Sequence, residues 1–446
     1  MPEYQLKSDS SRLIQLKVRF GQVHMDSSEM TENSEMTPIS FFDQPGVVIE
    51  TLQVGGVPLG LKQVTNSAVG IGGVYGSWGE SYDNAALLNR IEERLGEPLK
   101  PDERMDLSQL GFYHRHHITD LTDEEYLQVE TEVGARLLRS AAQACGWEPG
   151  EVEGVLIGAS GPIALDYTER IARQAGIPES ALKVSVHKAC DGSVGALHLA
   201  MNPALEMKSP VDHNLAEELL GKKVLVGGIE GLSRFIGSSR DINAMQFFGN
   251  GAGVIGIIPG ESMEFLVGQS HEFYDEEGVL AVRMFYPHSG LRRTDGTNVE
   301  TSTAGANHIR VAGLMHEPAD GKPIAMAGMM GMVKLFVRNG VGVVRVVYHK
   351  YQELMATRGI PDHRIAVAII HHANLKINKL KEKHLNNEGL TMPMPWLLTE
   401  FGNVSAASNM IALLKHLPHL RPGDHVLIDG FGAGTYYDSL VVSLGR

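Results

Sequence analysis

The chain has 446 residues, 43% hydrophobic and 21% charged, which is the composition of an ordinary globular protein with enough length for a large core or two domains. Its net charge of −14 argues against non-specific nucleic-acid binding, which needs clustered Lys and Arg. The two cysteines are too few for a disulfide framework, no apolar run reaches membrane-spanning length, and the first residues lack the order of a signal peptide. We therefore expect a cytoplasmic protein with no membrane span and no nucleic-acid partner.

The beginning of the chain differs in composition from the rest. Residues 22–45 are rich in Ser, Glu and Met and show no period, which indicates an extended arm. From about Gly55 onward the sequence changes to apolar runs punctuated by glycine. We expect an N-terminal arm over 1–60, followed by two halves over 61–260 and 261–446.

Helical and strand patterns alternate through both halves, which predicts an α/β fold. Val133, Leu137, Leu138 and Ala141 share one face of a predicted helix, and the strand-like "VEGVLIGAS" follows. The first half continues with helical "DYTERIARQAGI" and strands "LKVSV" and "KVLVGGIE". The second half places helices "LKINKLKEKHL" and "VSAASNMIALLKHL" between strands "RIAVAII" and "DHVLIDGFGAG". This similar order suggests a duplication.

Between the two patterns, residues 264–323 are polar and weakly periodic. We interpret them as a long excursion, either a lid or a surface insertion. A helical segment over 324–359 is expected to follow it.

Cys190 lies where the strand "LKVSV" passes into a helix through "HKACDGSVGAL". The unsatisfied N–H groups at a helix start stabilise a thiolate, so Cys190 is a candidate nucleophile. The alternative is a buried structural cysteine, since free cysteines are often buried. Cys145, at a helix end before "GWEP", is interpreted as structural.

Three further segments contain candidate residues. His371 ends a Val- and Ile-rich strand, where catalytic groups often lie, although a satisfied core or surface histidine is an equal alternative. Asn403 in "FGNVSAAS" could direct its amide at a carbonyl group, or belong to a plain Gly-Asn turn. The glycines of "DGFGAG" would let the backbone N–H of Ala433 contribute to an oxyanion hole.

Taken together and in this order, the four segments resemble the thiolase superfamily and most closely the β-ketoacyl-acyl carrier protein (ACP) synthase III group. The resemblance extends through "LGFYHRHHI", "EGLSR" and "FFGNGAG" and covers about residues 70–446. It implies a duplicated, five-layered αβαβα fold with mixed sheets. It also implies Cys190, His371 and Asn403 as catalytic residues, with the backbone N–H groups of Cys190 and Ala433 as the oxyanion hole.

The mechanism that the resemblance implies is a decarboxylative Claisen condensation. Cys190 carries the acyl group as a thioester, and His371 and Asn403 stabilise the enolate that a malonyl-type thioester forms on losing carbon dioxide. Acyl-CoA or acyl-ACP and a malonyl thioester would be substrates in fatty-acid, lipid or polyketide biosynthesis, and neither a cofactor nor a metal is expected. Alternatives are transfer of the acyl group to oxygen, nitrogen or another acyl chain, hydrolysis of the acyl-enzyme, and a non-catalytic partner with the same fold.

The resemblance also assigns residues to substrate and partner binding. Arg234 matches a cation that contacts coenzyme A, although the tryptophan of that site is replaced near Met105. Ile163 to Leu165 would form the acyl pocket. The lysines of "NLKINKLKEKHL" would dock an acidic carrier protein, unless they form a plain solvated helix face; they are Lys376, Lys379, Lys381 and Lys383.

Two neighbours of the candidate residues depart from the family pattern. His372 stands where the family has glutamine, and Asp191 occupies a position beside the nucleophile that is commonly small. An acidic neighbour can alter thiolate stability. The resemblance finally implies a homodimer in which the strand "LKVSV" pairs across the subunit interface.

Overall fold

The computed structural model describes residues 48–118, 121–160, 164, 166–205, 214–234, 241–272, 282–284, 299–305, 308–313, 324–326, 333–432 and 436–445. All of them belong to one unit of the chain, Ser40–Arg446. The expected arm over 22–45 lies outside the described residues.

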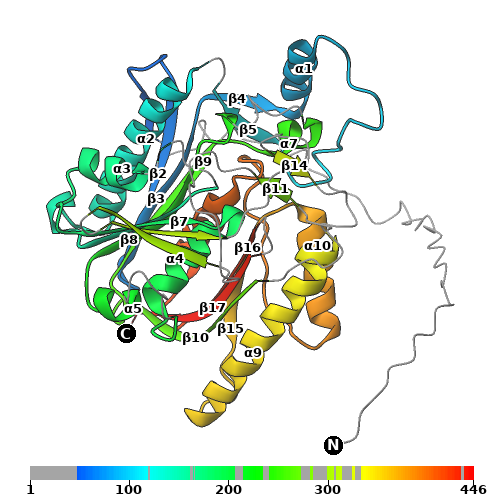
Figure 1. Ribbon diagram of the computed structural model, residues 1–446. Coiled ribbons are helices and arrows are strands. Elements are labelled where there is room, and N and C mark those ends of the chain that lie inside the picture. Colours follow the sequence, from blue (N-terminus) through cyan, green and yellow to red (C-terminus); the bar gives the residue numbers. More distant parts are fainter. Residues whose placement is uncertain are drawn as a thin grey trace, which may run out of the picture. The chain divides into compact units, whose positions relative to one another are not determined.

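Nine strands of the described residues form the larger sheet (Figure 1). In spatial order they are β1 (Val48–Thr51), β2 (Pro58–Asn66), β3 (Ile71–Trp78), β9 (Gly251–Ile257), β8 (Val224–Glu230), β6 (Gly154–Gly158), β7 (Leu182–His187), β13 (His308–Gly313) and β12 (Val299–Gly305). The pairs β8–β6, β6–β7 and β7–β13 are parallel and the others antiparallel. The sheet is therefore mixed.

The second sheet contains β10 (Met263–Glu272), β17 (Tyr436–Leu444), β16 (His425–Gly432) and β15 (Ile365–Ile370), in that spatial order. It is also mixed, because β15 and β16 run parallel while the other pairs are antiparallel. Two short sheets pair β4 (Glu80–Asp83) with β5 (His114–His117), and β11 (Val282–Met284) with β14 (Ile324–Met326).

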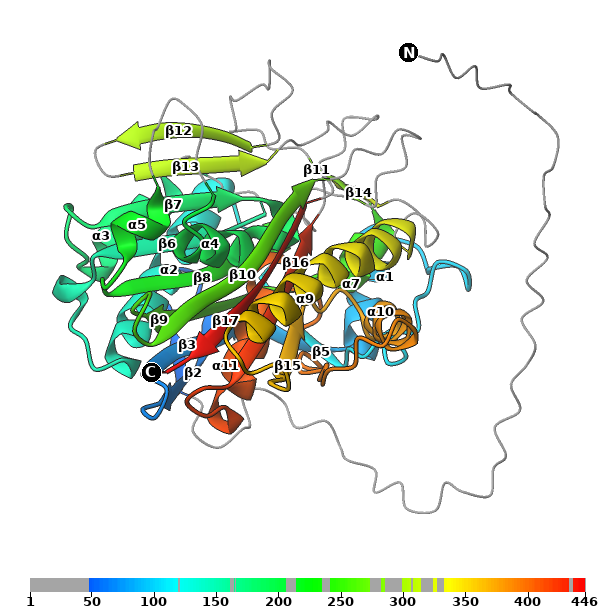
Figure 2. The same cartoon turned by 90° about the horizontal axis from the view of Figure 1, so that it is seen from below.

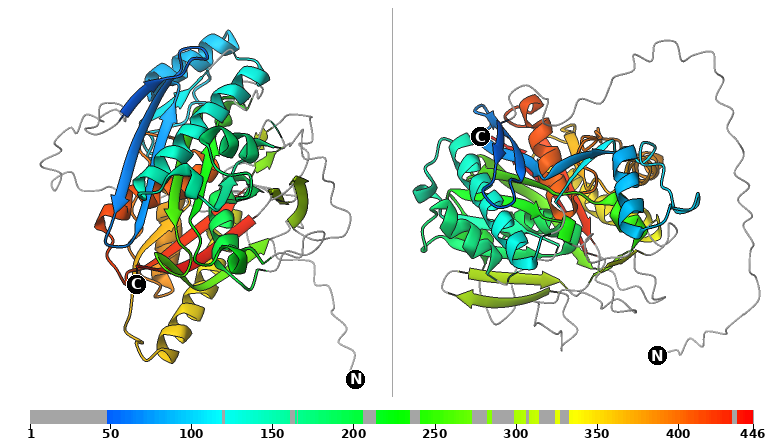
Figure 3. Two further views of the ribbon diagram at one scale, coloured as in Figure 1. Left: turned by 90° about the vertical axis from the view of Figure 1, so that its left-hand side faces the viewer. Right: turned by 90° about the horizontal axis from the view of Figure 1, so that it is seen from above.

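Helices separate and cover the two sheets (Figure 2). Two central helices, α4 (Gly192–Met201) and α11 (Ser408–His416), each contact strands of both sheets. On the outer face of the larger sheet pack α2 (Asp123–Ala144) and α3 (Tyr167–Ala175), and Figure 3 shows α2 beside the blue strands β2 and β3. The outer face of the second sheet is covered by α9 (Gly340–Thr357), against which α10 (Leu375–Asn387) packs. The expected five-layered α/β fold is confirmed.

The remaining helices are short or lie at the ends of the sheets. They are α1 (Asn84–Leu95), α5 (Leu215–Leu219), α7 (Ile242–Phe247), a π-helix over Val333–Asn339, and 3₁₀ turns at Pro149–Glu151, Ala189–Asp191, Ser405–Ala407 and Leu417–His419. The segment over 324–359, expected to be helical, is a strand at its start and helical from Val333 onward. Among the described residues, no helix is long and apolar enough to cross a membrane.

The region around the expected boundaries contains more strands than the sequence pattern suggested. β1 and the first residues of β2 lie inside the range expected as an arm. The expected excursion over 264–323 includes most of β10 and all of β12 and β13. Two of these strands are short or poor in apolar residues, VETSTAG of β12 and HIRVAG of β13, so they show too little pattern along the sequence and were not predicted for 264–323. The expected division near residue 260 falls between β9 and β10, which belong to different sheets.

Both edges of β7 are paired within the chain. β6 occupies one edge, and β13 pairs in parallel along the other, with His308–Ala312 opposite Lys183–His187 (Figure 2). The expectation that this strand pairs with its counterpart in a second copy is therefore wrong, because its backbone groups on that side already have partners. A homodimer formed in another way stays a prediction.

Glycines allow the central helices to lie against the sheet. A Cβ atom on Gly158, the last residue of β6, would lie 2.2 Å from the carbonyl carbon of Gly192 at the start of α4. Real contacts of a Cβ atom are essentially never this short, so β6 and α4 can approach so closely only with glycine at 158.

We expect Gly158→Ala to lower the free energy of unfolding by about 1–3 kcal/mol, because the added methyl group has backbone atoms on its path. Gly342→Ala on α9 is the matched control, since nothing lies within 4 Å of its added Cβ atom. The control should stabilise the helix by up to about 1 kcal/mol. Urea unfolding of both variants measures the difference, and equal effects would contradict the packing argument.

Candidate active site

Cys190 lies in the 3₁₀ turn Ala189–Asp191 that leads from β7 into α4. Its side chain is half-buried, whereas Ala189 before it and Asp191 after it are buried. The position at the start of a central helix is the one expected from the sequence, and it exposes the thiol to the positive end of the helix dipole.

A second 3₁₀ turn, Ser405–Ala407, leads into the other central helix and meets the first. Ser405 Oγ lies 3.1 Å from Cys190 Sγ and can donate a hydrogen bond to it. Within the described part of the chain, Ala189 at φ +48° and Ser405 at φ +44° are the non-glycine residues with positive φ. Backbone strain of this kind is typical of functional sites.

His371 follows β15 directly and is buried. Its Nδ1 lies 2.5 Å from Ser408 Oγ, and its ring packs edge-on against Phe431 with 4.9 Å between the centroids. Burial, together with His372 and Lys381, lowers the pKa of His371 to about 3, so the ring is neutral. When Nδ1 accepts from Ser408, the proton is on Nε2, which can then donate to a substrate carbonyl group.

Asn403 is buried and held by hydrogen bonds of its side chain and backbone. Its Oδ1 accepts from the backbone N–H of Ser405 at 2.8 Å, its Nδ2 donates to the carbonyl of Ala373 at 3.3 Å, and its backbone N–H donates to the carbonyl of Phe247. One Nδ2 proton is left to donate to a substrate. Through Ser405, Asn403 is connected to Cys190, and Ala373 is two residues from His371.

The end of β16 approaches the backbone of the nucleophile. A Cβ atom on Gly432 would lie 3.0 Å from the backbone N of Cys190 and 2.5 Å from the carbonyl oxygen of Lys188. Only glycine fits at this position. The glycine thus lets the end of β16 lie directly against the backbone of the nucleophile's turn. Ala433, the expected second oxyanion donor, lies outside the described residues, as do Ile163 and Leu165 of the expected acyl pocket.

Glu230 and Ser160 extend the site beneath Ser405. The hydroxyl of Ser160 hydrogen-bonds to that of Ser405 and lies 2.5 Å from Glu230 Oε1. The backbone N–H groups of Ser160 and Ala406 donate to the same oxygen at 2.8 and 3.0 Å. Burial raises the pKa of Glu230 to about 8 in spite of these donors. Neither residue was predicted from the sequence, although a carboxylate at the end of an apolar strand was a usable signal.

Glu130 on α2 is a second buried acid in this part of the molecule. A Cβ atom on Gly231 would lie 2.0 Å from its Oε1, so Glu130 lies directly beside the residue after Glu230. Burial raises the pKa of Glu130 to about 7, while Arg234 and Tyr167 oppose the rise. Arg234, expected to contact coenzyme A, is half-buried near this acid, and its role in binding stays a prediction.

Four buried charged or ionisable side chains lie below the nucleophile. Lys188 pairs with Asp438 and lies 3.3 Å from Asp191, and His198 Nδ1 lies 2.7 Å from Asp438 Oδ1. Burial and Asp438 raise the pKa of Asp191 well above its usual range. Asp191, the acidic neighbour noted in the sequence, therefore lies in a buried network in which Lys188 balances the charge of Asp438. Asp438 was not singled out, because nothing in the last strand marks it locally.

The expected basic face of α10 divides into two groups. Lys376, Lys379 and Lys383 are exposed, with Lys376 Nζ 2.7 Å from Gln109 Oε1 and Lys379 Nζ 2.8 Å from Glu382 Oε2. Lys381 is fully buried and pairs with the fully buried Asp429 at 2.5 Å. Its inclusion in an exposed patch was wrong, because it shares the inward face of the helix with Ile377 and Leu385.

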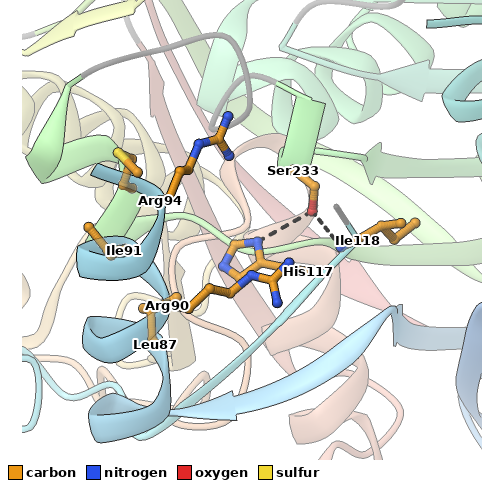
Figure 4. A pocket seen from close by; sticks show the side chains of 8 residues that line it. Leu87, Arg90, Ile91, Arg94, His117, Ile118 and Ser233 are labelled. Atoms are coloured by element: carbon orange, nitrogen blue, oxygen red, sulfur yellow. Dashed lines mark hydrogen bonds between the residues drawn. The ribbon is translucent and has the colours of Figure 1, made fainter. Parts of the chain in front are cut away.

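A pocket lies between α1, β5 and the segment that ends in Arg234 (Figure 4). Arg90 and Arg94 of α1 line it together with His117, whose Nδ1 lies 3.3 Å from Ser233 Oγ. Burial, with nearby Arg115, His116 and Arg90, lowers the pKa of His117 to about 3, so the cations at this pocket are the arginines. Apolar side chains complete the lining: Leu87, Ile91, Ile118 and Met245.

We expect Glu130→Gln to flatten the pH dependence of stability. The folded protein keeps the Glu130 proton up to about pH 7, whereas the unfolded chain loses it near the ordinary value of 4.5. The free energy of unfolding therefore falls as pH rises between these values, and glutamine removes that contribution. Urea unfolding at several pH values measures it, with Glu124→Gln on the exposed face of α2 as control. Parallel curves for wild type and Glu130→Gln would contradict the assignment.

Comparison with known proteins is consistent with the fold and motifs. Residues 355–444 match the family model described as 3-oxoacyl-[acyl-carrier-protein] synthase III C terminal. β-Ketoacyl-[acyl-carrier-protein] synthase III of Gloeobacter violaceus is 25% identical over 327 residues, which cover 71% of this chain and 84% of the relative. The protein of the same name from Clostridium tetani is 29% identical over 50% of this chain and 60% of its own length.

Solved structures give the same result for the fold. The 3-oxoacyl-[acyl-carrier-protein] synthase III of Aquifex aeolicus aligns with a TM-score of 0.55 and 18% identity, over 89% of this chain and all of the other. The 1,3,6,8-tetrahydroxynaphthalene synthase of Streptomyces coelicolor, a type III polyketide synthase, aligns with a TM-score of 0.57 and 12% identity over the same shares. The chain thus has the thiolase-like fold. Its resemblance to the β-ketoacyl-ACP synthases III, indicated first by the motifs, is confirmed.

Proposed function

We propose that the protein is a condensing enzyme of the β-ketoacyl-ACP synthase III type. The observation that carries the proposal is the position of Cys190, at the start of a central helix and within hydrogen-bond reach of Ser405, with Asn403 attached to the same serine. A half-buried thiol in this position can attack an acyl thioester and hold the acyl group. The relatives' names support acyl transfer in fatty-acid or related biosynthesis.

His371 and Asn403 would stabilise the second step. A neutral imidazole and a fixed amide can both donate to the carbonyl oxygen of a malonyl-type thioester, where negative charge develops as carbon dioxide leaves. The resulting carbanion attacks the acyl carbon on Cys190, and the C–S bond to Cys190 breaks. The backbone N–H of Cys190, near Gly432, and that of Ala433 would hold the oxyanion.

We expect Cys190→Ala to abolish both the acyl adduct and the condensation product. His371→Ala and Asn403→Ala should still form the adduct but lose condensation by about 10²-fold or more, since each removes one donor to the developing charge. Intact-protein mass spectrometry with acyl-CoA or acyl-ACP, followed by addition of the malonyl thioester, separates the steps. Cys145→Ala is the control. Undiminished product from Cys190→Ala would end the proposal.

The acyl donor is proposed to arrive on an acidic carrier protein. In a chain of net charge −14, the exposed side chains of Lys376, Lys379 and Lys383 form a positive face on α10. The arginines of the pocket in Figure 4 would instead attract the phosphates of a coenzyme A donor. No cofactor or metal is proposed, and a cytoplasmic location stays a prediction.

We expect Lys379→Glu combined with Lys383→Glu to raise the KM for acyl-ACP by roughly tenfold, or about 1.4 kcal/mol, with kcat little changed. The effect should shrink at high salt, because exposed charges are screened. Steady-state kinetics at two ionic strengths measure it, with the exposed Lys222→Glu before β8 as control. An equal response of the control would mean that overall charge, and not α10, sets the affinity.

A second candidate function is transfer of the Cys190 acyl group to water or to another nucleophile. The hydroxyl of Ser405, 3.1 Å from Cys190 Sγ, favours it, because a hydroxyl group beside the acyl-bearing sulfur could position such an acceptor. Product mass spectrometry without a malonyl thioester separates the two functions.

A further inference from the structure

A continuous series of hydrogen-bonding side chains connects Cys190 to a buried carboxyl group. Cys190 Sγ lies 3.1 Å from Ser405 Oγ, the hydroxyl of Ser405 hydrogen-bonds to that of Ser160, and Ser160 Oγ lies 2.5 Å from Glu230 Oε1. Cys190 is half-buried, whereas the other three residues are at most 2% exposed. The series therefore has one end at the substrate side and the other inside the protein.

Every group in the series can serve as a hydrogen-bond donor in one protonation state and as an acceptor in the other, so each bond can reverse. A hydroxyl group both donates and accepts, so the thiol can donate to Ser405, Ser405 to Ser160, and Ser160 to the carboxylate. Transfer of one proton along each bond leaves a thiolate and a neutral carboxyl group, with all three bonds reversed. The shift thus moves the negative charge from the buried carboxylate to the sulfur at the substrate side.

We propose, resting on the proposed acyl-transfer function, that Glu230 accepts the Cys190 proton through Ser405 and Ser160 when the thiol attacks an acyl thioester. In that step the S–H bond of Cys190 breaks and its S–C bond to the acyl group forms. The C–S bond of the donor breaks, and the proton held on Glu230 can return along the same path to the leaving thiolate. Glu230 touches no substrate and acts through the two serines.

The properties of His371 support this division of roles. Its Nδ1 is engaged with Ser408, and burial lowers its pKa to about 3, which makes it a poor proton acceptor. The pKa of Glu230, raised to about 8 by burial, lies close to that of an ordinary thiol at about 8.5. Proton exchange between groups so closely matched costs little free energy.

The groups around the two ends of the series define its pH dependence. Burial is the main cause of the raised pKa of Glu230, the donors from Ser160 and Ala406 oppose it, and Glu130 raises it further. Burial, together with the charge of Glu230, raises the pKa of Tyr167. Among the described residues, further charged or titratable groups nearby include Arg234 beside Glu130, Lys188 and Asp191 beside Cys190, and Asp438 and His198 next to Lys188. Protonation of Glu230 closes the path, so reactivity should rise as pH passes about 8.

Alkylation of Cys190 by iodoacetamide tests the path without any acyl donor. The full-length protein is treated between about pH 6 and 10, and peptide mass spectrometry gives the rate at each cysteine separately. In wild type the rate at Cys190 should rise with a midpoint near 8. Cys145 is an internal control, because burial raises the pKa of its thiol to about 11.

Glu230→Gln keeps the size of the side chain and an oxygen that accepts from Ala406, but it cannot take up a proton. We expect the midpoint at Cys190 to move from about 8 to that of a thiol alone, about 8.5, so that the rate at and below pH 8 falls about two- to threefold. Ser405→Ala and Ser160→Ala interrupt the path and should give the same loss. Ser160→Thr keeps the hydroxyl and should retain the rate, and Glu130→Gln controls for removal of a nearby buried acid.

Wild-type rates and midpoint in a folded Glu230→Gln protein would overturn the proposal. Should that variant not fold, the two serine-to-alanine variants decide: loss of rate supports the path, and an unchanged profile overturns it. At each pH the rate at Cys145 must be the same in wild type and in every variant. A protein with this alkylation profile but no condensation product would contradict the proposed function and leave the proton path standing.

Discussion

The site depends on two central helices that begin at the same point between the two sheets. Each follows a 3₁₀ turn whose first residue has positive φ, Ala189 before α4 and Ser405 before α11. Such conformations cost about 1–3 kcal/mol each and persist only when surrounding packing holds them. Glycines in the adjoining strands supply the space: a Cβ atom on Gly228 would lie 2.5 Å from the carbonyl oxygen of Ala406. The reacting groups are thus fixed by backbone packing.

Buried cations around this point are paired with carboxylates, and buried histidines are neutral. Lys381 is paired with Asp429, and Lys188 with Asp438, while His371 and His372 have pKa values lowered to about 3 and about 4 by burial. His372 accepts a hydrogen bond from the backbone N–H of Leu397, so its departure from the family glutamine serves structure. Neutral donors in dry surroundings suit a reaction in which negative charge develops on a carbonyl oxygen.

The sequence predicted the features that are encoded locally. Cys190, His371 and Asn403 stand in short segments whose turn and strand patterns are visible along the chain. The link between Ser160 and Ser405 joins residues 245 positions apart, so no local pattern contained it. The burial of Lys381 was predictable, because the spacing of Ile377 and Leu385 places it on the inward face. The strands β12 and β13 were missed because their few apolar residues leave too short a pattern along the sequence.

The hairpin of β12 and β13 has a consequence for how copies of this chain could assemble. Where β13 adds to β7, the sheet is continued by the chain itself, so its outermost strand on that side becomes β12. A neighbouring copy joining there would meet β12 and would stand two strands, or about 10 Å, further from the strand that leads to Cys190. An interface formed by continuing this sheet would therefore run along β12, and the strand that leads to the nucleophile would lie inside the sheet of each copy.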